Sequence, residues 1–178
     1  MKHTEIVYHY TAPEQLSVEQ LDAVCRLVEA GGGVDSRWLR HNLERAYLIA
    51  RAEVAGELVG VSSLKRPRAE YVQRIREKLG LDIEGFLERG YTSIRPEYRG
   101  LGIGTTLLGG LTSRAEGYHI YSLIREDDRA TQTIALRNRT VKIVVFFSEL
   151  TGKELGLWMP AKTAADLGLK SISGEDES

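Results

Sequence analysis

A glycine-rich run between residues 91 and 108 holds the residues best suited to binding an anion. Gly100, Gly102 and Gly104 stand between a β-prone segment and a predicted helix. Because glycine lacks a Cβ, a ligand can come close to its backbone. The first N–H groups of a helix have no acceptor within the helix, and the positive end of the helix dipole lies beside them. The spacing therefore predicts a site for a phosphate group at this turn.

Two common phosphate-binding patterns do not match this run. A P-loop requires lysine directly after its last glycine, and Thr105 follows Gly104 instead. The dinucleotide pattern G-x-G-x-x-G requires glycine at position 105 or 107, where the chain has Thr105 and Leu107. The sequence therefore argues against a nucleoside triphosphatase and against a nicotinamide-dependent enzyme.

A third pattern, R-x-x-G-x-G, is met by Arg99, Gly102 and Gly104, and a proline precedes it. In this form the run resembles the acyl-CoA motif of the GNAT superfamily of N-acetyltransferases. The resemblance is specific over Ile94 to Leu108 and extends more loosely, through the order of elements, over most of the chain. It implies an α/β fold with a mixed, twisted sheet, helices on its faces and two central parallel strands that splay apart. An ordinary strand–turn–helix is the alternative interpretation.

The resemblance also implies where acetyl-CoA would bind. In GNAT proteins the pantetheine arm lies between the splayed strands, and the pyrophosphate lies on the glycine loop and the start of the helix. The cofactor-binding positions implied here are Ile94, Arg99, Gly100, Leu101, Gly102, Ile103, Gly104 and Thr105. For Arg99 two roles stay open, a cationic contact to the cofactor and a surface residue that shapes the turn.

The reaction implied is direct transfer of an acetyl group from acetyl-CoA to a primary amine on a small molecule or a protein. A protonated lysine-like amine, with a pKa of about 10.4, cannot attack until it loses its proton, so a general base is useful. Glu88 is the candidate base, since some GNAT histone acetyltransferases place a glutamate at a similar point. A solvated residue at the end of a helix is its alternative role. Asp127 and Asp128 are weaker candidates, and either could instead cap the next helix.

The general acid is harder to assign. Many GNAT relatives carry a tyrosine on the helix after the second splayed strand, but residues 131–138 contain none. Tyr91, Tyr118 and Tyr121 lie near the relevant strands, and Tyr91 is the candidate acid, with aromatic packing as the alternative for each. Solvent could also protonate the thiolate. The missing tyrosine keeps a second function open, a catalytically silent module that binds acyl-CoA and regulates.

Hydrophobic spacing and turn signals predict the elements that position these residues. Before the motif we expect a strand over 5–10, helices from Ser17 to the glycines at 31–33 and from Asp35 or Ser36 to Ala46, and strands over 47–52 and 57–64. Residues 68–90 form an insertion relative to the plain GNAT pattern, with one helix ended by Gly80 and a second over 82–89. After the motif we expect a helix over 105–115, a strand over 118–124, a helix over 130–138 and strands over 141–148 and 154–159.

The acceptor is scarcely encoded in the sequence. By resemblance, its pocket would use the loop 31–33 and the last hairpin around 149–153. Trp38 and Trp158 could line it, although packing is their alternative role. The inserted helices could cover the mouth of this pocket or only extend the fold.

The bulk composition fits one domain over residues 1–172, with an acidic tail over 173–178 that we expect to be disordered. The single cysteine, Cys25, excludes an internal disulfide and falls on the apolar stripe of a helix, so we expect a core residue. No signal-like or membrane-spanning segment is evident, which predicts a cytoplasmic protein without a membrane partner.

The formal net charge of -1 gives no global field for nucleic acid. Nucleic-acid binding is therefore not expected, although docking of nucleic acid or protein through the basic stretch 65–78 is a third interpretation. The four histidines show no metal-ligand spacing, so no metal is expected. The sequence leaves open whether the protein forms a homodimer.

Overall fold

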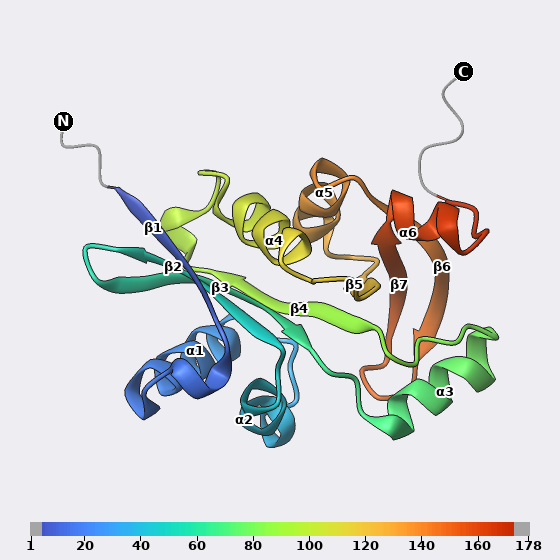
Figure 1. The fold of residues 1–178 in the computed structure, drawn as a ribbon, viewed down its shortest axis with the longest axis horizontal. Helices are drawn as coiled ribbons and strands as arrows, with labels where there is room; N and C mark the ends of the chain where they lie inside the picture. Colours follow the sequence, from blue (N-terminus) through green and yellow to red (C-terminus); the bar gives the residue numbers. More distant parts are fainter. Residues whose placement is uncertain (1–4, 173–178) are drawn as a thin grey trace.

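Within residues 5–172, which the computed structural model describes, a seven-stranded sheet runs in the order β1-β2-β3-β4-β5-β7-β6 (Figure 1). Only β4 and β5 pair in parallel among these neighbours. The predicted mixed α/β sheet is therefore confirmed. The predicted acidic tail, residues 173–178, lies outside the described residues. The strands are β1 (Ile6–Thr11), β2 (Leu48–Val54), β3 (Glu57–Lys65), β4 (Leu87–Ile94), β5 (Ile120–Arg125), β6 (Thr140–Ser148) and β7 (Lys153–Pro160).

Helices cover both faces of this sheet. Figure 1 shows α1 (Val18–Gly31) and α2 (Ser36–Glu44) on one face, and α4 (Ile103–Ser113) and α5 (Arg129–Arg137) on the other. Helix α3 (Ala69–Leu79) lies beside the end of the sheet formed by β6 and β7. A short helix α6 (Ala161–Asp166), which the sequence did not predict, follows β7. No helix among residues 5–172 has the length and apolar character needed to cross a membrane.

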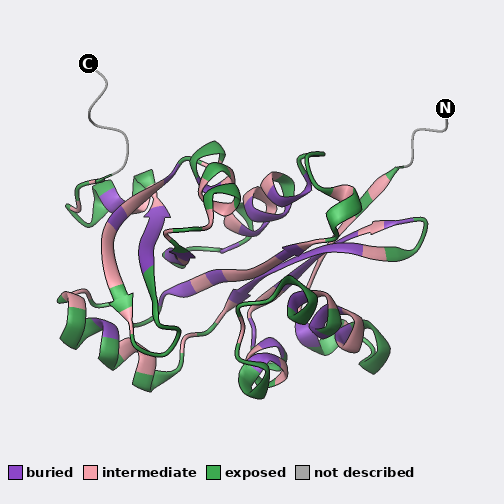
Figure 2. Cartoon of the chain, turned by 180° about the vertical axis from the view of Figure 1, so that it is seen from behind, coloured by how far each residue is buried: buried purple, intermediate pink, exposed green. Residues whose placement is uncertain are grey.

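Burial explains how the amphipathic helices attach to the sheet. The inward faces of α1, α2 and α4 are buried together with the central strands (Figure 2). Cys25 is buried with α1, as expected, and Leu107 and Leu111 of α4 are fully buried against β2, β3 and β4. A separate cluster packs Ile75 of α3 with Tyr121 of β5 and with β6 and β7. Burying a leucine or isoleucine side chain stabilises the fold by about 1.5–3 kcal/mol.

Several predicted helix boundaries are confirmed by capping contacts. The Ser17 hydroxyl accepts a hydrogen bond from the Gln20 N–H (3.1 Å), and the Gln20 side chain accepts one from the Ser17 N–H (2.9 Å). Asp35 caps α2 by accepting from the Arg37 N–H (3.1 Å). Gly80 ends α3 in the left-handed conformation, with φ 67°.

The prediction of a second inserted helix over 82–89 is wrong. The Asp82 carboxylate accepts a hydrogen bond from the Glu84 N–H (3.0 Å), which closes a turn, and Ile83 and Phe86 are buried. Strand β4 then begins at Leu87. The predicted start of α4 at Thr105 is also wrong, because the helix begins at Ile103.

The two parallel strands pair over a very short stretch. Leu87 lies opposite Ile120, Glu88 lies opposite Tyr121, and no further pair joins β4 to β5 within the described residues. Beyond Glu88 the strands diverge, so the predicted splay is confirmed. The facing edges of the two strands can therefore accept a ligand in place of a neighbouring strand.

A bulge in β4 lies just beyond the point of divergence. Ser63 pairs with Gly90 and Val61 with Ser93, so two residues of β4 stand opposite Ser62. Tyr91, one of these two, has φ 55°, a left-handed conformation that costs a non-glycine residue about 1–2 kcal/mol. The Ser63 hydroxyl donates to the Gly90 carbonyl oxygen (2.9 Å) and supports the bulge. The bulge therefore sets the direction in which the end of β4 faces the gap.

Candidate active site

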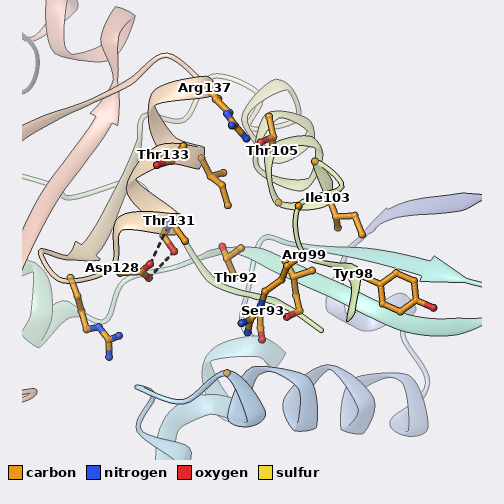
Figure 3. Close-up of a pocket in the computed structure, with 18 residues that line it drawn as sticks. Thr92, Ser93, Tyr98, Arg99, Ile103, Thr105, Asp128, Thr131, Thr133 and Arg137 are labelled. Atoms are coloured by element: carbon orange, nitrogen blue, oxygen red, sulfur yellow. Dashed lines mark hydrogen bonds between the residues drawn. The ribbon is translucent and has the colours of Figure 1, made fainter. Parts of the chain in front are cut away.

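A cleft of about 550 Å³ opens where β4 and β5 diverge (Figure 3). Figure 3 shows Thr131, Thr133 and Arg137 on α5 along one side and Ile103 and Thr105 on α4 along the other. Seven of the eight predicted cofactor positions line the cleft: Ile94, Arg99, Gly100, Gly102, Ile103, Gly104 and Thr105. Leu101 does not line it, and 60% of its surface is exposed.

The glycine loop leaves the start of α4 open. Gly100 and Gly102 have φ values of 80° and 79°, and a Cβ at either position would meet nothing within 4 Å. The left-handed backbone, rather than crowding, is therefore why glycine is needed at both. Gly102 is the N-cap of α4, and no side chain caps the helix there. The first N–H groups of α4, at Ile103 and the residues after it, are consequently available to an anion.

Gly104 has a different role in the same turn. A Cβ on Gly104 would lie 2.8 Å from the Ile134 Cδ1, so glycine allows α5 to approach α4 closely. A similar restriction applies on β3, where a Cβ on Gly60 would lie 2.9 Å from the Ile103 Cγ2. Because glycine stands at both positions, Ile134 of α5 and the backbone of β3 can pack closely against the first turn of α4. They therefore fix the width and position of the cleft.

The lining of the cleft is predominantly positive. Arg99, Arg125 and Arg137 line it, whereas Asp128 is its single acidic residue. The Asp128 carboxylate is occupied, because it accepts from the Thr131 N–H (3.0 Å) and hydroxyl (2.7 Å) as the N-cap of α5 (Figure 3). Its alternative role as a helix cap is thus confirmed. Arg125 and Arg137 were not predicted as site residues, because the sequence does not show that the end of β5 and one face of α5 both turn toward the start of α4.

A second cavity of about 270 Å³ continues the cleft toward the point where β4 and β5 meet. The two share Thr92 and Arg125, among others, and the second cavity reaches Glu88 and Tyr91. The loop 31–33 forms part of its rim. Helix α1 is held there because the Ser93 hydroxyl donates to the Leu27 carbonyl oxygen (3.0 Å).

Glu88 lies on β4 itself, at the last pair before the strands diverge. Its alternative role as a residue at the end of a helix is therefore wrong. One carboxylate oxygen is 3.4 Å from the Lys65 Nζ, and only 17% of the Glu88 side chain is exposed. Glu88 and Lys65 also line a third cavity, of about 190 Å³, which shares no residue with the first cleft. The carboxylate of Glu88 therefore lies between the second and third cavities and is open to both.

Two tyrosines, the buried Tyr121 and the partly buried Tyr71, lie close to Glu88. Burial raises the pKa of Tyr121 well above its usual value, and the negative charge of Glu88 raises it further. Burial also raises the pKa of Tyr71, on α3, and the negative charge of Glu88 raises it further. The Tyr121 hydroxyl has no hydrogen-bond partner among the described residues. Tyr71 was not predicted as a site residue, since nothing in the sequence shows that the insertion folds back on β4.

The other tyrosines considered from the sequence lie differently. The Tyr91 hydroxyl accepts a hydrogen bond from the Asn42 Nδ2 (2.9 Å), and the Lys65 Nζ lies 3.7 Å from the centre of its ring. Tyr91 therefore lines the second cavity with its hydroxyl held by α2. Tyr118 packs against the Tyr47 ring, with 5.2 Å between ring centres, and lines neither the cleft nor the second cavity.

Arg89 places a buried positive charge beside the second cavity. Its guanidinium donates to the hydroxyls of Thr112 and, at 3.0 Å, Thr140. Within residues 5–172 no carboxylate forms an ion pair with it. Burial lowers the pKa of Arg89 to about 10, so the group still carries its charge at neutral pH. In the same described part of the chain, no cluster of three His, Cys, Asp or Glu side chains could hold a metal ion.

Comparison with known proteins finds a family model and solved structures that are similar to this chain. A model of the acetyltransferase (GNAT) family matches residues 17–137. The ribosomal-protein-S18-alanine N-acetyltransferase from Escherichia coli has a TM-score of 0.63 at 11% identity, over 97% of this chain and 99% of that one. An acyl-CoA N-acyltransferase from Pseudomonas aeruginosa has a TM-score of 0.62 at 15% identity, over 87% of this chain and 99% of that one.

A third solved structure is informative because it contains a ligand. It is a Bacillus anthracis protein in complex with acetyl coenzyme A, with a TM-score of 0.50 at 14% identity over 65% of this chain and 62% of that one. These identities are low, so the solved structures support the fold alone. A search of curated protein sequences finds no match.

The coupling between Glu88 and the tyrosines Tyr71 and Tyr121 can be tested by titration. Glu88→Gln removes a negative charge, so Tyr71 and Tyr121 should lose their protons at lower pH than in the wild type. Burial remains the larger cause, so both should still ionise above pH 10.0. The measurement is the 13Cζ chemical shift of labelled tyrosine, assigned with Tyr71→Phe and Tyr121→Phe. Identical titrations in both proteins would contradict the placement of Glu88.

Proposed function

The chain belongs to the acetyltransferase (GNAT) family, and on that premise we propose that it transfers an acetyl group from acetyl-CoA to a primary amine. One observation carries the proposal. A positively lined cleft at the uncapped start of α4 continues through a second cavity to the carboxylate of Glu88. An activated acyl donor and a proton acceptor would therefore meet at the point where β4 and β5 diverge.

The residues of the cleft fit acetyl-CoA. The first N–H groups of α4 and the arginines Arg99 and Arg137 would hold the pyrophosphate, since both the helix dipole and the guanidinium groups favour negative charge. The edge of β4 over residues 92–94, which β5 does not pair, would hold the amide groups of the pantetheine arm, and the Arg99 Nε that now donates to the Ile94 carbonyl oxygen (3.3 Å) would turn to the cofactor. The Bacillus anthracis neighbour, solved with acetyl coenzyme A, supports the same choice of ligand. Bound in this way, acetyl-CoA supplies a thioester whose acetyl carbon can accept an amine.

Glu88 would act as the general base. It would take a proton from the amine, directly or through one water, while the new C–N bond forms and the C–S bond of the thioester breaks. Its position between the second and third cavities supports this role, because the amine can reach it without crossing the cofactor cleft.

The proton for the departing sulfur has two sources. Tyr91 is the proposed acid, although its hydroxyl is already held by Asn42. A thiolate whose parent thiol has a pKa of about 8.5 also takes its proton readily from water. The proposed reaction therefore does not depend on a tyrosine in α5.

Charge introduced at the loop should prevent cofactor binding. Gly102→Glu places a carboxylate at the N-cap of α4, and we expect the affinity for acetyl-CoA to fall at least about 100-fold, or about 2.8 kcal/mol. Gly102→Ala is the control, because it carries the same left-handed strain without the charge. Isothermal titration calorimetry measures both. Wild-type affinity in Gly102→Glu would refute the pyrophosphate site.

Loss of the base should slow turnover without weakening cofactor binding. For Glu88→Gln we expect kcat to fall by about 10²–10⁴ at neutral pH and to recover partly at higher pH, where more of the amine is already deprotonated. The Kd for acetyl-CoA should not change. Glu57→Gln, at the exposed start of β3, is the matched control.

Release of CoA thiol on a panel of primary amines measures this turnover. A kcat equal to that of the wild type across the pH range would remove Glu88 from the mechanism. Tight binding of acetyl-CoA with no turnover of any amine by the wild type would instead favour a regulatory module.

A further inference from the structure

The third cavity differs in character from the cofactor cleft. It shares Lys65, Glu88 and Leu123 with the second cavity, and it is bounded by α2, by the start of the insertion and by the turn between β6 and β7. Figure 1 shows these elements converging at the lower edge of the sheet. An acceptor that enters here would meet Glu88 from the side opposite the cofactor.

One wall of this cavity is strongly basic. Lys65, Arg66 and Arg68 follow one another at the junction of β3 and α3, and Glu88 is the single acidic residue in the lining. Lys65 is already paired with Glu88. Arg66 and Arg68 stand where this cavity adjoins another of about 570 Å³, and their positive charges would repel a cationic acceptor such as a polyamine.

The two arginines are held in position by aromatic rings rather than by carboxylates. The Arg68 Cζ lies 4.3 Å from the centre of the Trp38 ring, and the Arg66 Cζ lies 5.5 Å from that of Tyr47. No carboxylate within residues 5–172 forms an ion pair with either. The Asp35 carboxylate is bound by Arg37 at 3.0 Å, and hydrogen bonds from Arg37, with a smaller contribution from the charge of Arg68, lower the pKa of Asp35. A stacked guanidinium keeps its N–H edge available, and that edge matches a carboxylate in geometry.

Part of the remaining lining is apolar, beside the polar residues Ser148 and Thr151. Leu123, Leu150 and Leu155 form this apolar part, and Leu155 is buried while Leu150 is largely exposed. The volume of about 190 Å³ corresponds to a small molecule rather than to a folded surface. A basic site, an acidic site and an apolar site thus lie in one small cavity.

We propose that the acceptor is an amino acid with an apolar side chain. Its amine would face Glu88, its carboxylate would bind Arg66 and Arg68, and its side chain would contact the leucines. The proposal rests on the proposed function. In the reaction the amine nitrogen bonds to the acetyl carbon as the C–S bond breaks, the amine proton goes to Glu88, and the departing sulfur takes a proton from Tyr91 or water. The products are an N-acetyl amino acid and CoA thiol.

A matched pair of acceptors tests the charge requirement directly. L-leucine and L-leucinamide differ in one negative charge, and the amide loses its ammonium proton more easily because it has no neighbouring carboxylate. Reactivity alone therefore predicts faster acetylation of leucinamide. We expect the opposite order, with kcat/KM at least about tenfold higher for leucine, since charge-assisted hydrogen bonds to arginine distinguish the two.

Substitution of the arginines should remove this preference. In the double variant Arg66→Gln, Arg68→Gln we expect kcat/KM for leucine to fall about 10–100-fold through KM, while leucinamide changes less than about twofold. Arg26→Gln, on the exposed side of α1 and outside all of these cavities, is the control. Thermal unfolding of the double variant checks that it is folded. The comparison of leucine with leucinamide in the wild type does not depend on that result.

Each outcome decides a different statement. Turnover of leucinamide by the wild type as fast as leucine, or equal loss for both acceptors in the double variant, overturns the acceptor proposal and leaves the proposed function intact. If no amine is acetylated, the proposed function fails. Calorimetric binding then decides the acceptor site: binding of leucine but not leucinamide, lost in the double variant, supports it, and equal binding or no binding overturns it.

Discussion

The structure depends on how soon the pairing between β4 and β5 ends. Two residue pairs join these strands, and beyond Glu88 their facing edges separate. A sheet that continued to pair would have no gap, and α4 would cover a closed surface. Because pairing stops early, the backbone of β4, the first turn of α4 and the start of α5 all face one cleft. The site is therefore built from main-chain geometry first and from side chains second.

The end of this pairing also determines the electrostatics. Glu88, the last paired residue of β4, lies 3.4 Å from the Lys65 Nζ and close to the two tyrosines with raised pKa values, while the buried cation Arg89 follows it in the strand. Positive charge dominates on both sides of it, along the cofactor cleft and at the mouth of the third cavity. These two positive regions favour anionic ligands on both sides of the Glu88 carboxylate.

Local patterns in the sequence were sufficient for the sheet, the glycine loop and most helix boundaries. Gly100 and Gly102 signal a left-handed turn whatever surrounds them, and Ser17 with Gln20 forms a cap that needs no tertiary contact. The predictions failed where contacts between segments distant in the sequence determine the structure. Residues 82–89 had helical spacing, but their apolar side chains are buried against β5–β7 and the chain turns into β4. Tyr71, Arg125 and Arg137 join the site through long-range packing, which spacing alone cannot reveal.

The uncapped N–H groups at the start of α4 are proposed to bind the phosphates of CoA. Backbone amide signals of 15N-labelled protein, followed by NMR as CoA is added, test it most directly. We expect the largest shifts on residues 102–105, together with smaller ones on residues 92–94 at the open edge of β4. Saturable CoA binding that leaves the signals of residues 102–105 unchanged would contradict it.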